Sequence, residues 1–353
     1  MALSDPPELA LEADVPLAPR TTLEVGGSAE RFLRATHDAD FGAAIHWSHA
    51  RGVPLTVLGG GSNAIVPDAG VAGLVLEVAT RGIERLGSGR VRVAAGEDWG
   101  RFVDAMVEDG LAGVECLAGI PGRVGATPIQ NVGAYGQEVA SGIERVEALD
   151  RRTGEARRFA AAECGFAYRH SRFKEEPGRW LVTHVVFALE PGGPPARRYA
   201  ELVKATPEDA SLEAVRDTVV ALRRRKSMVL DAADPNRRSA GSFFTNPIVS
   251  SSAAADARRR AAALGLAGEV PAWDQPDGRV KLAAGWLIEQ AGLPRGIRRG
   301  AVGLSSAHAL ALVNHGGATA TELLAFAEEV RERVRDAFGV DLEREPRLLG
   351  VDG

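Results

Sequence analysis

Residues 118–135 read Ala-Gly-Ile-Pro-Gly-Arg-Val-Gly-Ala-Thr-Pro-Ile-Gln-Asn-Val-Gly-Ala-Tyr, and this stretch constrains the architecture more than any other. Four glycines and two prolines at this density exclude a regular helix or a long strand. The segment is also too apolar for a solvated linker, because Ile120, Val124, Ile129 and Val132 would lie in water. We therefore expect a loop that is buried or covered by a flat ligand. Its backbone N–H groups can form a concave nest for phosphate.

A second loop of this kind lies upstream, where residues 58–63 read Leu-Gly-Gly-Gly-Ser-Asn. Two loops that offer backbone donors indicate a ligand with a pyrophosphate. The third spaced glycine of a G-x-G-x-x-G turn is absent after Leu58. We therefore do not expect a Rossmann turn to hold that pyrophosphate.

Length, charge and cysteine content exclude several classes of protein. A chain of 353 residues is long enough for two or three domains with filled cores. A net charge of -5 argues against nucleic-acid binding, and we interpret the basic runs 223–226 and 258–260 as solvated helix faces. No apolar run reaches the roughly 18 residues that span a membrane. Two cysteines and no signal-like start indicate a cytoplasmic protein.

Periodicity and capping signals predict a mixture of helices and strands, which is typical of the α+β class. The segments with strand-like patterns are 54–58, 73–78, 91–94 and 181–187. The segments with helical spacing and end signals are 38–51, 98–108, 211–225 and 319–338. Residues 1–15 are acidic, carry two adjacent prolines and are expected to be a disordered tail. The Pro- and Asp-rich connector 231–238 places a domain boundary near residue 226.

Three polar clusters, at residues 168–174, 241–247 and 341–346, carry groups suited to catalysis. Arg169, Ser242 and Glu345 together could stabilise an oxyanion and move a proton. Taken singly, each residue also fits a simpler interpretation: Arg169 as a surface cation, Ser242 as a turn residue and Glu345 as a solvated charge. These alternatives stay open at this point.

Two other kinds of site are disfavoured. His46 and His49 lie three residues apart in a helical segment, but no carboxylate or cysteine at ligand spacing completes a metal site. Ser242 is not in a G-x-S-x-G elbow, which argues against a serine hydrolase.

The chain resembles the UDP-N-acetylenolpyruvoylglucosamine reductase family from about Pro16 to Gly350. The motifs that carry the resemblance, in order, are residues 58–63, 119–135, 168–174, 241–247, 281–289 and 342–345. The resemblance implies a vanillyl-alcohol-oxidase/PCMH-type FAD-binding fold of two α+β domains with a third α+β substrate-binding domain. The implied division is FAD subdomain 1 over 16–80, joined by 340–353, FAD subdomain 2 over 81–225, and the substrate-binding domain over 226–339.

The resemblance also implies the residues of the site. It assigns catalysis to Arg169, Ser242 and Glu345. It assigns FAD binding to Gly59, Gly60, Gly61, Ser62, Asn63, Ile120, Pro121, Gly122, Gly125, Gln130, Asn131, Gly133, Ala134 and Tyr135. It assigns substrate binding to Tyr168, Tyr199, Lys226, Asn246 and Glu289, with Tyr199 in the position of the lid tyrosine that one branch of the family carries.

The implied activity is the NADPH-dependent reduction of UDP-N-acetylglucosamine enolpyruvate to UDP-N-acetylmuramate through FAD, in bacterial peptidoglycan precursor synthesis. Arg169 and Glu345 would stabilise an enolate-like charge, and Ser242 would protonate C2 of the substrate. FAD is expected to be non-covalent, because neither glycine loop holds a His or Cys. We expect a monomer without metal. Two alternatives stay open: another FAD oxidase or dehydrogenase on the same fold, and a flavin- or nucleotide-sugar-binding regulatory module without turnover.

Overall fold

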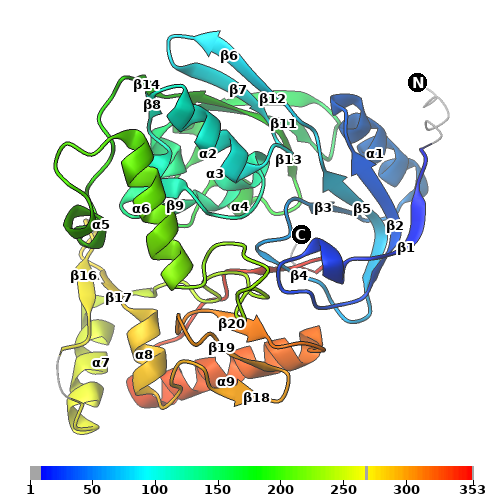
Figure 1. Ribbon diagram of the computed structural model, residues 1–353. Helices are drawn as coiled ribbons and strands as arrows, with labels where there is room; N and C mark the ends of the chain where they lie inside the picture. Colours follow the sequence, from blue (N-terminus) through cyan, green and yellow to red (C-terminus); the bar gives the residue numbers. More distant parts are fainter. Residues whose placement is uncertain (1–8, 267–268, 352–353) are drawn as a thin grey trace.

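The computed structural model describes residues 9–266 and 269–351 of the chain. Two sheets with their helices occupy the upper part of Figure 1, and a smaller unit, coloured yellow to red, lies below them. Helices and strands both contribute to all three units, as the sequence predicted. Within the described ranges, no helix has the length and apolar character needed to cross a membrane.

The first sheet is mixed and carries the first glycine loop. Its strands, in spatial order, are β1 (Glu12–Pro16), β2 (Ser28–Ala35), β5 (Val71–Val78) and β3 (Leu55–Leu58). β1 is antiparallel to β2, whereas β2, β5 and β3 run parallel. Helix α1 (Asp38–Arg51) makes the crossover that parallel strands require, and it ends at Gly52 with a φ of 62°.

The predicted disordered tail is wrong in part. Glu12–Val15 belong to β1, which pairs with β2 along the edge of the sheet. Val15 is the buried residue of that strand, and backbone hydrogen bonds to β2 hold its exposed residues in place. An acidic composition does not reveal such backbone pairing. Residues 1–8 of that prediction lie outside the described residues.

The second sheet is antiparallel throughout. Its strands, in spatial order, are β12 (Ala156–Ala160), β11 (Ile143–Asp150), β13 (Trp180–Ala188), β7 (Arg90–Ala94) and β6 (Ile83–Gly87). Helices α2 (Trp99–Glu108) and α6 (Leu212–Arg225) bury apolar residues in the core that this sheet shares with the first. Trp99, Phe102 and Phe187 pack there with ring centroids 4.6–6.2 Å apart.

Short elements connect the two sheets and surround the second glycine loop. They are β8 (Leu111–Ala112), α3 (Thr127–Gln130), β9 (Gly133–Ala134), β10 (Gln137–Glu138), α4 (Arg172–Glu175), β14 (Glu190–Pro191) and α5 (Ala200–Ala205). One-turn 3-10 helices lie at Ala18–Arg20, Glu115–Leu117, Val124–Ala126, Val139–Ser141 and Ala161–Cys164.

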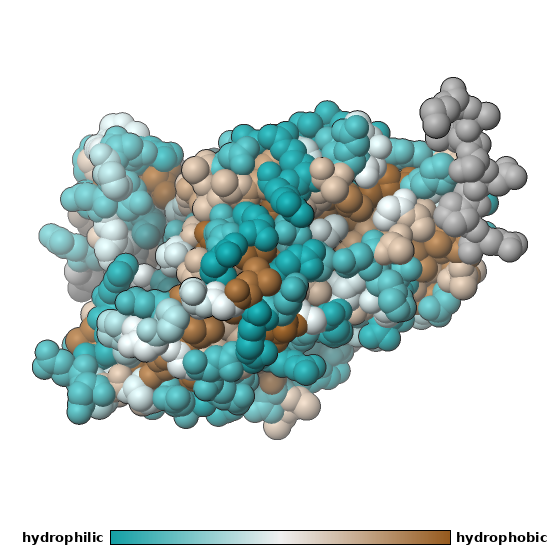
Figure 2. Space-filling model, turned by 90° about the horizontal axis from the view of Figure 1, so that it is seen from above, coloured by the Kyte–Doolittle hydropathy of each residue, from teal (hydrophilic) through white to brown (hydrophobic). Residues whose placement is uncertain are grey.

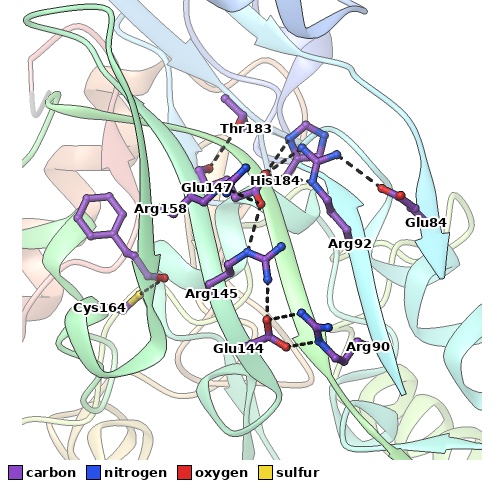
Figure 3. A network of polar contacts seen from close by, with 11 residues as sticks. Glu84, Arg90, Arg92, Glu144, Arg145, Glu147, Arg158, Cys164, Thr183 and His184 are labelled. Carbon is purple, nitrogen blue, oxygen red and sulfur yellow. Dashed lines mark hydrogen bonds and ion pairs between the residues drawn. The ribbon is translucent and has the colours of Figure 1, made fainter. Parts of the chain in front are cut away.

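The opposite face of the second sheet carries a charged network instead of an apolar layer (Figure 3). The glutamates of β11 face arginines on β7 and on β11 itself, so opposite charges lie side by side across the strands. On the face of the molecule seen in Figure 2, hydrophilic residues predominate and the hydrophobic patches are interrupted. Within the network, Glu147 and His184 are nevertheless buried.

The described residues of the third unit form two small antiparallel sheets and three helices. The strands are β15 (Ile248–Val249), β17 (Val280–Leu282) and β16 (Ala272–Asp274) in one sheet, and β18 (Arg298–Arg299), β19 (Val302–Leu304) and β20 (Leu312–Asn314) in the other. The helices are α7 (Ser251–Ala263), α8 (Ala284–Gln290) and α9 (Ala320–Phe338). The predicted capping box of Thr319 and Glu322 starts α9, and Gly339 ends it.

The C-terminal segment returns to the first unit. β21 (Arg347–Leu348) pairs in parallel with β4 (Ala64–Ile65), which directly follows the first glycine loop. This pairing supports the proposal that residues 340–353 join residues 16–80. It also places Glu345, two residues before β21, beside that loop.

Candidate active site

The two predicted glycine loops lie against each other. A Cβ at Gly60 would stand 2.8 Å from Cα of Gly122, so only glycine allows this approach. The hydroxyl of Ser62 donates to the carbonyl of Pro121 at 2.9 Å and ties the loops together. The close packing of loops far apart in the sequence creates one continuous lining.

Two hollows meet at these loops. The first, about 270 Å³, runs along β3 and the first loop toward Arg151, Phe173 and Trp180. The second, about 390 Å³, lies between the second loop and the third unit. The residues that line both are Ser62, Asn63, Arg123, Ala126 and Gln130. An elongated ligand can therefore extend from one hollow into the other.

The lining at this junction fits a dinucleotide such as FAD. The side-chain oxygen of Gln130 is buried and has no hydrogen-bond partner among the described residues. A buried acceptor without a partner is costly in a folded protein, so a ligand donor is expected there. Glycine loops on both sides offer backbone donors to phosphate.

Arg169 is held in a strained conformation that directs it into the second hollow. Its φ is 51°, the left-handed region that non-glycine residues rarely adopt. Paired backbone hydrogen bonds between Ala167 and His170 enforce this turn. The guanidinium donates to the carbonyls of Gly133 at 2.8 Å and Asn131 at 3.4 Å. Its orientation is thus fixed by the second glycine loop.

Ser242 and Glu345 come together because their segments pair as strands do. Glu345 N–H donates to the carbonyl of Phe243 at 2.9 Å, and Phe244 bridges Arg344 in an antiparallel contact. The side chain of Glu345 reaches Arg169, with Oε1 3.2 Å from Nε. Both Ser242 and Glu345 line the second hollow with Arg169.

Burial controls the protonation of the acidic and imidazole groups of the site. It raises the pKa of Glu345, and the nearby Arg169 and Lys174 offset only part of that effect. His308 lies with Nε2 3.3 Å from Oγ of Ser242. Burial, with Lys226 and Arg223 nearby, lowers the pKa of His308 to about 4. The imidazole is therefore neutral near pH 7 and can share a hydrogen bond with the Ser242 hydroxyl.

The structure brings most of the predicted site residues to these hollows, but not all. The FAD-binding candidates all line one hollow or both, except Asn131. The Asn131 amide is instead used inside the protein, where it donates to Glu138 and to the carbonyl of Ala167 and accepts from Ala140 N–H. Its role is to hold the loop that carries Arg169.

The substrate-binding candidates divide into two groups. Tyr199 and Lys226 line the second hollow. Tyr168, Asn246 and Glu289 do not. Tyr168 and Asn246 interact with each other beside Arg169, and the carboxylate of Glu289 accepts from Nε of Arg295 at 2.8 Å on the surface of the third unit.

Among the residues of the second hollow that the sequence did not single out are Arg223 and His308. The interpretation of the run 223–226 as a solvated helix face is wrong for Arg223, which is 6% exposed. Burial lowers the pKa of Arg223 to about 10. Its helical register with Val219 could have revealed this, since both lie on the buried stripe of α6. His308 had no such signal, because only the tertiary fold places it beside Ser242.

Comparisons with known proteins agree with this geometry. Residues 29–160 match the profile of a FAD binding domain, and residues 234–349 match the C-terminal domain of UDP-N-acetylenolpyruvoylglucosamine reductase. The chain is 51% identical to the UDP-N-acetylenolpyruvoylglucosamine reductase of Streptomyces coelicolor, over 96% of this chain and 90% of the relative. The corresponding protein of Thermobifida fusca is 49% identical over 96% and 98%.

The overall fold also has a solved counterpart. The crystal structure of UDP-N-acetylenolpyruvylglucosamine reductase from Thermus caldophilus superposes with a TM-score of 0.65 and 27% identity, covering 96% of this chain and 98% of the other. The predicted α+β fold, with a FAD-binding part and a third unit, is confirmed. The chain belongs to the UDP-N-acetylenolpyruvoylglucosamine reductase family of FAD-dependent oxidoreductases.

Proposed function

We propose that the protein reduces UDP-N-acetylglucosamine enolpyruvate to UDP-N-acetylmuramate with NADPH, for peptidoglycan precursor synthesis, and that Arg169, Ser242 and Glu345 are its catalytic residues. The observation that carries the residue assignment is their convergence on one hollow from three segments far apart in the chain. FAD, when bound, supplies the hydride relay between NADPH and the organic substrate.

Arg169 provides a fixed positive charge. Because the carbonyls of Asn131 and Gly133 hold its guanidinium, little reorganisation is needed when negative charge develops on C2 of the substrate and is delocalised onto its carboxylate. The raised pKa of Glu345 favours a carboxyl group that keeps or shares a proton beside Arg169. Arg169 and Glu345 would thus stabilise the negative charge of the intermediate, because a protonated Glu345 adds no second negative charge beside it.

Ser242 supplies the proton that C2 needs after hydride addition at C3. A serine hydroxyl is a weak acid in water, but an enolate is basic enough to take its proton. His308, neutral near pH 7 and 3.3 Å away, would orient that hydroxyl. Tyr199 and Lys226, at the rim of the hollow, would contact the substrate.

The proposal is tested by anaerobic absorbance spectroscopy of the purified protein. We expect a yellow protein whose flavin bands bleach with NADPH and return when UDP-N-acetylglucosamine enolpyruvate is added. Acid should release intact FAD, since the attachment is non-covalent. Flavin that NADPH does not reduce, or that only oxygen reoxidises, would identify a different flavoenzyme on this fold.

We also propose that the enzyme works as a monomer in the cytoplasm. Both cysteines, Cys116 and Cys164, are unpaired and buried, which suits a reducing compartment. Sedimentation of the FAD-loaded protein tests the oligomeric state, and a dimer would contradict it.

A further inference from the structure

Arg151 is a half-buried cation, and no acidic side chain among the described residues pairs with it. It opens the turn between β11 and β12, where its N–H donates to the carbonyl of Arg179 at 2.7 Å. Nη2 of its guanidinium donates to the carbonyl of Leu55. Nε is buried without a hydrogen-bond partner in the described part of the chain. Burial lowers the pKa of Arg151, and no acidic side chain opposes this effect.

Such a group is expensive to bury unless something binds it. An unpaired buried donor on a charged side chain costs more than a neutral one. Arg151 lines the first hollow, together with the apolar side chains of Val57, Phe173 and Trp180. The combination of apolar walls and one polar group is typical of a pocket that orients a flat ligand.

Its position along the hollow indicates which part of the ligand it meets. Arg151 is anchored on Leu55, which is the first residue of β3. The glycine loop begins at Gly59, directly after the last residue of that strand. At roughly 3.3 Å per residue, the two points are about 13 Å apart. That distance is too long for an arginine anchored at Leu55 to reach a pyrophosphate on the loop.

The orientation of FAD follows from the catalytic residues and so rests on the proposed function. Arg169, Ser242 and Glu345 line the second hollow, and the reacting ring system must lie beside them. The pyrophosphate lies at the glycine loops, where the hollows meet. The first hollow, with Arg151 at its far end, is left for the adenosine half.

We propose that Arg151 binds the adenosine half of FAD by donating a hydrogen bond to it, and that the protein thereby distinguishes FAD from FMN. FMN has the same ring system and one phosphate but no adenosine, so it cannot use Arg151. The contribution of Arg151 is therefore to cofactor affinity and selection, and it leaves the hydride chemistry unchanged.

The test is cofactor binding to apoprotein, followed by quenching of flavin fluorescence. Arg151→Met removes all donors, whereas Arg151→Lys keeps one nitrogen for Leu55 and guards against loss of fold. Each should weaken FAD binding, Arg151→Met by about 10- to 100-fold, the range for losing a charged hydrogen-bond donor. FMN binding should stay within about twofold of wild type. Arg152→Met, at the exposed next position of the same turn, is the matched control and should change neither the FAD affinity nor the FMN affinity.

Three results would overturn the proposal. Unchanged FAD affinity in both variants removes Arg151 from the site. Equal losses for FAD and FMN show that it only supports the fold. A loss for FAD that disappears at high salt shows a contact with the pyrophosphate instead, because screening acts on charge pairs. The proposed function is judged separately, since NADPH should reduce the FAD-loaded wild type and Arg152→Met at the same rate whatever Arg151 contributes to cofactor binding.

Discussion

At the scale of single residues, the site depends on groups whose neighbours hold them in place. Backbone carbonyls hold the guanidinium of Arg169. A backbone hydrogen bond from Glu345 to Phe243 holds Glu345, and the hydroxyl of Ser242 lies beside His308. Each of these side chains also has an unremarkable interpretation in the sequence. What distinguishes them is that they meet in one hollow, where burial raises the pKa of Glu345 and lowers the pKa of the neighbouring His308.

Ser242→Ala should separate the two half-reactions. Reduction of the flavin by NADPH needs no proton from Ser242 and should stay near the wild-type rate. Reoxidation by the enolpyruvyl substrate should fall by about 100-fold or more, as expected for loss of a positioned acid. Stopped-flow absorbance at the flavin band measures both steps.

The control for that change is Thr245→Val, which removes a hydroxyl from the same loop but lines neither hollow. It should leave both steps unchanged. A normal reoxidation rate in Ser242→Ala would remove this serine from the mechanism, and equal losses in both steps would show a structural role.

At the scale of elements, short pieces position the site and longer ones support them. Tyr199 is the residue before α5, is 47% exposed, and packs edge-on against Tyr135 at 5.5 Å. The ion pair of Glu201 and Lys226, at 2.6 Å, links α5 to the end of α6. A tyrosine that is exposed on one side and contacts the loop on the other suits a lid over the substrate.

Tyr199→Phe should raise the KM for the enolpyruvyl substrate and leave reduction by NADPH unchanged. We expect a several-fold effect, roughly 3- to 30-fold, the size of one lost hydrogen bond. Val203→Ala, on the same helix and 43% exposed, is the control. An unchanged KM in Tyr199→Phe would mean that Tyr199 is an ordinary surface residue at the start of a helix.

The charged network of the second sheet is a stabilising element that responds to pH (Figure 3). Glu147 accepts from Arg92 at 2.9 Å and from Arg145 at 3.3 Å, and is only 8% exposed. Burial raises its pKa, but these arginines outweigh burial and bring the pKa below the ordinary 4.5. Its contribution to stability is therefore present above pH 4.5 and is lost as the pH falls through the lower folded-state value.

Glu147→Gln should reduce the free energy of unfolding by about 1–2 kcal/mol at pH 7. The effect is no larger because Arg92 and Arg145 are partly exposed, so water can solvate them when the carboxylate is gone. The difference from wild type should shrink as thermal unfolding is measured at progressively lower pH, below 4.5. Glu84→Gln, whose carboxylate is 62% exposed and 3.7 Å from Arg92, is the control and should change little. A constant difference at every pH would contradict the role of the charge.

At the scale of the whole molecule, polar contacts add to a shared apolar cluster in docking the third unit on the first. Asp68, just after β4, accepts from the N–H groups of Ala320 and Thr321 at 2.7 and 2.9 Å, and so caps α9 from another unit. The amide of Asn314 donates to the carbonyls of Leu23 and Glu24. These contacts help to fix the position of the unit that carries Ser242.

Asp68→Ala should lower stability by about 1–2 kcal/mol, through loss of a helix cap and of a charge at the helix N-terminus. Hydrogen exchange should quicken at the start of α9 in this variant. Asp336→Ala, at an exposed position near the other end of α9, is the control. Equal exchange at the start of α9 in the two variants would show that Asp68 does not anchor the unit.

The sequence alone determined the features that depend on local chemistry. Glycine density marked both loops, and a Cβ at Gly60, Gly61 or Gly125 is incompatible with the packing. Periodicity and caps predicted α1, α2, α6 and α9, because helix ends and apolar stripes are local properties. The ordered motifs indicated the family, and through it the residues that we propose as catalytic.

Only the tertiary structure decided which residues share a cavity, since burial and contact depend on segments far apart in the chain. It moved Arg223 from a solvated face to the core, placed His308 beside Ser242, and left Glu289 on the surface. It turned the predicted tail at Glu12–Val15 into an edge strand. It also placed the half-buried Arg151 beside a hollow, with no acidic partner among the described residues, which no local pattern around the turn could reveal.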